Sequence, residues 1–149
     1  MFRAAAVAVS MVMWAALALP ATAVAGDEEY VDVVQSQLDA VKDFAERKGY
    51  EGTHNEHIDR LGQGASDDYT FQLQEGRDYL IVSVCDQDCS DLDLTLYDEN
   101  NNEIATDTST DDAPVVEVSP RWSGKFRLNV TMYACSNAPC YYGISVMGK

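Results

Sequence analysis

The sequence predicts a mostly β protein: a jelly-roll-like antiparallel β-sandwich of about seven or eight strands, preceded by one amphipathic α-helix. Two observations predict this architecture. Apolar residues recur every three or four positions over residues 27–48, and from residue 68 onward they alternate with polar residues in short runs separated by turns. We therefore expect three parts: a leader at residues 1–25, a helix at residues 26–50 and a sandwich at residues 51–149.

The leader has the features of a secretory signal peptide. Arg3 supplies a positive charge, an apolar core follows, and Ala23-Val24-Ala25 forms a small-residue cleavage site. The apolar core, about 16 residues long, is shorter than the roughly 20 residues that span a bilayer. We therefore expect cleavage, export to the periplasm or the extracellular medium, and no stable membrane insertion afterwards.

The chain is strongly acidic, with a formal net charge of −15. This charge repels the phosphates of nucleic acids and the surfaces of anionic membranes, so neither is an expected partner. Cations and basic surfaces remain, which favours an extracellular or periplasmic protein or polymer as the partner.

Residues 27–48 have the signals of a complete helix. Asp27 is suited to the N-cap, basic residues close the segment, and Gly49 marks the stop. The apolar stripe comprises Tyr30, Val34, Leu38, Val41 and Ala45. This stripe must be buried, either against the sandwich of the same chain or against a second copy of the helix.

The strands follow in order along the chain. A glycine-punctuated connector at residues 49–64 has one weak strand signal, "EHIDRL". Clear alternation then appears in "YTFQLQ", "YLIVSVC", "LDLTLY", "EIAT", "VVEVS", "KFRLNVTMY" and "YYGISVM". The alternation predicts inward-facing side chains at Leu92, Leu94, Leu96, Phe126, Leu128, Val130, Met132, Tyr142, Ile144 and Val146.

Tracing these strands up and down brings three loops to one end of the sandwich. The loops carry two closely spaced cysteine pairs, Cys85 with Cys89 and Cys135 with Cys140. They also carry acids that could bind calcium together: Asp86, Asp88, Asp91, Asp107, Asp111 and Asp112.

An even number of cysteines after an export signal predicts disulfides. Zinc is disfavoured, because thiolates would be oxidised before they could bind the metal. Bridges within each pair would close small loops, whereas bridges between the pairs would join two strand ends. Spacing alone leaves all three connectivities open.

Three stretches together resemble the bacterial pre-peptidase C-terminal domain, over residues 53–147. "ASDDYTFQLQEGRDYLIVSV" is similar to the family's aromatic strand, glycine turn and second strand. "SDLDLTLYDENNNEIATD" resembles its D-x-D-L strand with a following turn, and "GKFRLNVTMY" its glycine-led strand before the last hairpin.

The resemblance implies a secreted, free-standing, non-catalytic β-sandwich, in a family where some relatives bind calcium or extracellular polymers. The sequence departs from the family pattern in three respects. No protease domain accompanies the sandwich, the helix and both cysteine pairs are additions, and Asn101-Asn102 stands where the family often turns on glycine.

Other chemistries have weaker signals. Neither acidic loop fits an EF-hand, since the glycine and bidentate glutamate positions are wrong, so calcium would need ligands from several loops, and solvated turn-forming acids are the alternative. His54 and His57 with Glu56 could hold a transition metal only on a helix, and no serine lies in a nucleophile-elbow motif.

We therefore expect a non-catalytic binding or accessory module without a certain cofactor, with calcium as the candidate. The first alternative is an assembly protein that self-associates through its N-terminal helix. The second is a small hydrolase.

Overall fold

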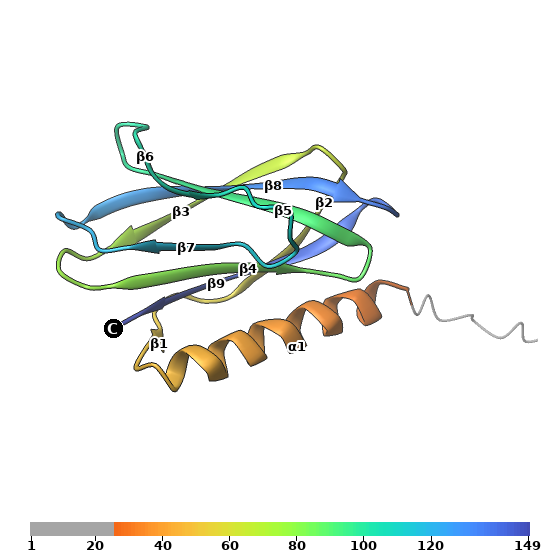
Figure 1. Cartoon of the computed structure of the whole chain (residues 1–149), viewed down its shortest axis with the longest axis horizontal. Coiled ribbons are helices and arrows are strands. Elements are labelled where there is room, and N and C mark those ends of the chain that lie inside the picture. Colours follow the sequence, from red (N-terminus) through yellow and green to blue (C-terminus); the bar gives the residue numbers. More distant parts are fainter. Residues whose placement is uncertain (1–25) are drawn as a thin grey trace, which may run out of the picture.

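The computed structural model describes residues 26–149, so the expected signal peptide at residues 1–25 lies outside the described residues. One helix, α1 (Gly26–Glu46), precedes nine strands (Figure 1). The strands are β1 (Glu51–Gly52), β2 (His57–Leu61), β3 (Ser66–Leu73), β4 (Tyr79–Cys85), β5 (Cys89–Tyr97), β6 (Glu103–Asp107), β7 (Val115–Val118), β8 (Gly124–Cys135) and β9 (Cys140–Gly148). Within this range, no helix combines the length and the apolar character needed to cross a membrane.

The strands form two antiparallel sheets that pack face to face, which confirms the predicted β-sandwich with one preceding helix. One sheet has the order β1-β9-β4-β7, with β2 also paired to β9, and the other has the order β3-β8-β5-β6. The structure has more strands than the alternation indicated, because the connector contributes both β1 and β2 along β9. Only β2 gave a sequence signal, since β1 has two residues.

The core lies between the sheets and contains the side chains that alternation placed inward. Leu92, Leu94 and Leu96 of β5 are 0% exposed. The predicted inward residues of β8 and β9 belong to the same buried cluster. A strict period of two therefore identified the buried face of these three strands correctly.

β4 is buried on both faces. Ile81 and Cys85 face the sandwich core, whereas Val82 and Val84 face α1. The helix lies along the outer face of the first sheet, against β9 and β4 (Figure 1). A third layer therefore covers the middle of this sheet.

The apolar stripe of α1 is the surface that docks on the sheet. Val34, Leu38 and Ala45 are 0% exposed and pack with Val82 and Met147. Of the two expected partners for the stripe, the structure shows the sandwich of the same chain. The helix is thereby part of the folded unit that positions the loops.

Candidate functional site

Backbone contacts join the three loops that connect β4 to β5, β6 to β7 and β8 to β9. The Leu92 amide donates to the Asp111 carbonyl at 2.9 Å, and the Ser136 amide donates to the Asp88 carbonyl at 2.8 Å. The structure thus brings the three loops to one end, which we call the acidic loop end (residues 86–91, 107–114 and 135–140).

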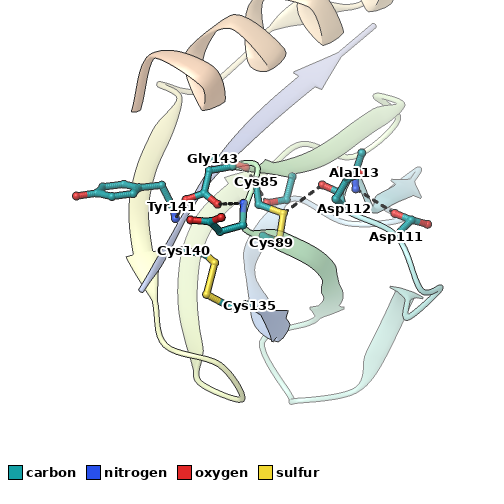
Figure 2. Close-up of a disulfide and its surroundings, with 12 residues drawn as sticks. Cys85, Cys89, Asp111, Asp112, Ala113, Cys135, Cys140, Tyr141 and Gly143 are labelled. Carbon is teal, nitrogen blue, oxygen red and sulfur yellow. Dashed lines mark hydrogen bonds between the residues drawn. A yellow bond between two sulfur atoms is a disulfide. The ribbon is translucent and has the colours of Figure 1, made fainter. Parts of the chain in front are cut away.

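Two disulfides lie within this end, Cys85–Cys89 and Cys135–Cys140 (Figure 2). Each disulfide closes its own loop. Of the three connectivities that the sequence left open, the structure therefore has the one with both bridges within the pairs. Cys89 and Cys135 are register partners on β5 and β8, which places the two bridges on neighbouring strands. The Cys85–Cys89 bridge limits the freedom of the loop that carries Asp86 and Asp88.

Asp86 is a structural carboxylate at the centre of this end. It is 1% exposed, and it accepts hydrogen bonds from the Tyr141 amide at 2.6 Å and the Asp88 amide at 3.0 Å. These bonds tie the β4–β5 loop to the start of β9. Both carboxylate oxygens are therefore already engaged, which leaves Asp86 poorly suited to bind a ligand directly.

Asp107 and Asp111 hold the β6–β7 loop. Asp107 accepts from the Val115 amide at 2.9 Å and the Ser109 amide at 3.1 Å, while Asp111 accepts from the Ala113 amide at 3.0 Å. The Val115 hydrogen bond lowers the pKa of Asp107 below its usual value, since it stabilises the ionised form. The turn-forming role that sequence offered as an alternative is thus what these two side chains perform.

Asp91 has a buried carboxylate oxygen without a partner. The residue is 6% exposed, and its Oδ1 atom has no hydrogen-bond donor. The neighbouring Asp93 has a raised pKa, first because of burial and then because Asp91, Asp107 and Asp111 are close enough to repel its charge. Sequence alternation placed Asp93 away from the inward leucines but gave no reason to include it among the candidate ligands.

The remaining two candidates, Asp88 and Asp112, have side chains available to solvent. Asp112 is exposed, and its carbonyl oxygen lies 3.6 Å from the disulfide-bonded Sγ of Cys85 (Figure 2). Asp88 is half-buried and receives a long contact from Asn137 Nδ2 at 3.4 Å. Across residues 26–149, no three or more His, Cys, Asp or Glu side chains converge on a geometry that could hold a metal ion.

The hydrogen-bond and packing partners of the two histidines lie outside the acidic loop end. His54 Nδ1 lies 2.8 Å from Thr53 Oγ1, and its Nε2 lies 3.0 Å from the Gln72 carbonyl. His57 packs its ring on Tyr69, at 4.4 Å between centroids, and points to the opposite side of β2 from Ile58, which faces α1. Glu56 instead accepts from Gln35 of α1 at 3.0 Å, so the three side chains do not form a shared site.

No family model and no curated protein matches the sequence. The fold is similar to a solved structure, the pre-peptidase C-terminal domain of a collagenase from Bacillus anthracis, with a TM-score of 0.52 and 21% sequence identity. The similarity covers 64% of this chain and 90% of that domain. The chain therefore has a pre-peptidase C-terminal-like fold, as the sequence resemblance implied, and this likeness speaks to the fold alone.

Proposed function

We propose that the protein is an exported, non-catalytic binding module that recognises a cationic protein or polymer through its acidic loop end. The observation that carries this proposal is the way the loops are held. Two disulfides and hydrogen bonds from main-chain amides to Asp86, Asp107 and Asp111 fix the loops, while Asp112 is exposed and Asp88 is half-exposed. A surface that is ordered before binding loses less conformational entropy when a partner binds.

The bonding of the polar groups favours binding over hydrolysis. Asp107 accepts hydrogen bonds from backbone amides, which lower its pKa and keep it ionised rather than poised to donate a proton. Both ring nitrogens of His54 lie within hydrogen-bond distance of Thr53 or Gln72.

A lysine-rich peptide serves as a probe of this surface. We expect binding that weakens steeply as salt is raised, because the attraction is between exposed charges. The double variant Asp88→Asn, Asp112→Asn should weaken binding several-fold. A matched double variant at other exposed acids, Glu75→Gln with Glu103→Gln, should leave it nearly unchanged, and equal losses from both would show attraction to net charge alone.

Calcium is the candidate cofactor of the same end, and the unpartnered Oδ1 of Asp91 beside the like-charged Asp93 supports it. A divalent cation there would supply the missing partner for Asp91 and offset the repulsion. Thermal unfolding in EDTA and in millimolar calcium tests this, since a ligand of the native state raises Tm. We expect a rise of several degrees that Asp91→Asn abolishes and Glu75→Gln retains; equal Tm values would reject calcium and leave the cationic-partner proposal standing.

A further inference from the structure

A groove runs along the outer face of the first sheet, where α1 covers β9 and β4 but leaves β7 bare. It has a volume of about 700 Å³, and its lining includes Val41, Phe44, Lys48, Leu80, Val115 and Lys149. This size is within the range of small-molecule sites, which are typically 300–1,000 Å³. The groove lies on the opposite face of this sheet from the sandwich core.

The floor and one wall of the groove are apolar and open to solvent. Phe44 of α1 is 53% exposed and Val115 of β7 is 39% exposed, although both stand beside buried residues such as Val82. Phe44 is exposed because it lies outside the apolar stripe of α1 that docks on the sheet. A large aromatic side chain at a concave apolar surface is typical of a binding site.

Two ammonium groups line the same groove without a carboxylate partner. The ion pairs within residues 26–149 involve other residues, so neither Lys48 nor Lys149 takes part in one. Lys48 Nζ instead lies 4.7 Å from the Phe44 ring centroid, and Lys149 Nζ lies 4.3 Å from that of Tyr50. In a chain of net charge −15, two lysines on aromatic rings make a local site for an anion.

The two ends of the groove differ in charge. Lys48 and Lys149 are lining residues near the C-terminal end of α1, whereas Ala113, at the other extreme of the lining, follows Asp111 and Asp112 of the acidic loop end. An anionic group is therefore attracted to the lysines and repelled from the loops. The stretch between them is lined mainly by apolar residues, with Glu117 as its one acidic side chain, and it suits an uncharged body.

We propose that this groove binds an amphipathic carboxylate, with an unbranched apolar chain along Val41, Phe44, Leu80 and Val115 and the carboxylate between Lys48 and Lys149. The chain would remove Phe44 and Val115 from water. The carboxylate would accept charge-assisted hydrogen bonds from ammonium groups that now lack an anionic partner. This site is independent of the function proposed for the acidic loop end.

Isothermal titration calorimetry with dodecanoate, below its micelle concentration, tests the site on protein purified after expression of the full-length sequence. We expect a Kd of about 0.1 mM or tighter, in keeping with the efficiency of small ligands. Dodecyltrimethylammonium is the discriminating probe, because the net charge of the protein attracts its head group. The proposal requires dodecanoate to bind at least about tenfold more tightly than this cation, a difference of about 1.4 kcal/mol.

Two exposed side chains provide variants that should keep the fold. Phe44→Ala and Lys48→Gln should each weaken dodecanoate binding at least about fivefold. Their matched controls are Tyr133→Ala, 65% exposed on β8, and Lys125→Gln on the same strand, and both should bind as the unchanged protein does.

Several results would overturn the proposal. These are the absence of binding, equal binding of the two amphiphiles, binding that Lys48→Gln leaves unchanged, and binding only to vesicles of anionic phospholipid. The last result would assign the surface to a membrane rather than to a free carboxylate. Glu117→Gln adds a separate check, since removing the single acidic side chain of the lining should strengthen binding.

Discussion

At the scale of single residues, the turn between β5 and β6 shows how asparagine fits a backbone conformation that favours glycine. Asn101, where the sequence resemblance implied a glycine turn, has φ 61°. Asparagine tolerates this left-handed conformation better than most residues, so it can replace the glycine. The next residue, Asn102, donates twice to Asp98, through its amide and its side chain, each at 2.8 Å.

The first prediction concerns Asp98, which is 4% exposed. The Asn102 side chain, with the amides of Asn102 and Asn100, lowers the pKa of Asp98. A carboxyl group whose pKa is lower in the folded protein stabilises the fold above its unfolded pKa of about 3.9, and this stability is lost as pH falls through the folded pKa. Asp98→Asn should therefore lower Tm at pH 7 by several degrees and converge with the unchanged protein in strong acid.

Thermal unfolding between neutral and acidic pH measures this difference. Glu99→Gln is the matched control, because Glu99 is the exposed neighbour in the same turn. If Asp98→Asn and the unchanged protein had equal Tm values at pH 7, the three hydrogen bonds to the Asp98 side chain would not depend on its charge.

The second prediction concerns Asp93, whose ionised form should destabilise the fold, whereas that of Asp98 stabilises it. Burial first, and then the charges of Asp91, Asp107 and Asp111, raise the pKa of Asp93. Ionised Asp93 therefore destabilises the fold at neutral pH, and the penalty disappears as pH falls below its folded pKa. In EDTA, Asp93→Asn should raise Tm at pH 7 and have little effect near about pH 3; a lower Tm at pH 7 would contradict it.

At the scale of elements, the docking of α1 depends on a glycine in β9. A Cβ atom at Gly143 would lie 2.7 Å from Leu38 Cδ1 and 2.8 Å from Val34 Cγ1. These distances are too short for carbon atoms, so these side chains, or the helix that carries them, would have to shift. The helix stripe could be predicted from sequence, whereas the need for glycine opposite it could not, because "YYGIS" gives no sign of which element approaches.

The third prediction follows from this contact. Gly143→Ala should destabilise the protein by about 1–3 kcal/mol through overpacking. Gly124→Ala is the matched control, since its new Cβ would meet the Trp122 side chain at 3.4 Å, an ordinary contact distance. Val34→Ala should be less harmful on the Gly143→Ala background than alone, as a double-mutant cycle of denaturation curves would show. Additive losses would place the strain elsewhere.

At the scale of the whole molecule, the sandwich followed from the sequence because most of its strands alternate against a single core. Alternation was less informative for β4, where "LIVSV" is apolar on both faces, because its second face belongs to the helix layer. The acidic loop end could be placed by tracing strand directions. The exact role of each acid could not, since hydrogen bonds such as Tyr141 to Asp86 join residues far apart in sequence.

The fourth prediction tests whether α1 is a structural layer or an assembly device. A chain without residues 26–48 would expose Val82, Val84 and Met147, which are now 3%, 1% and 1% exposed. Burying Val34 and Leu38 against them contributes about 1.5–3 kcal/mol for each side chain. We therefore expect the shortened chain to unfold at a lower temperature and to aggregate through the bared sheet.

Light scattering coupled to size-exclusion chromatography, followed by thermal unfolding, measures both effects. An assembly helix gives a different pattern, in which the complete protein is oligomeric and the shortened one is a stable monomer with unchanged Tm. Leu38→Ala in the complete protein also distinguishes a structural layer from an assembly helix, with a smaller change to the chain. A cavity beneath the helix should lower stability by about 2–5 kcal/mol without changing the oligomeric state, because Leu38 contacts the sandwich of its own chain.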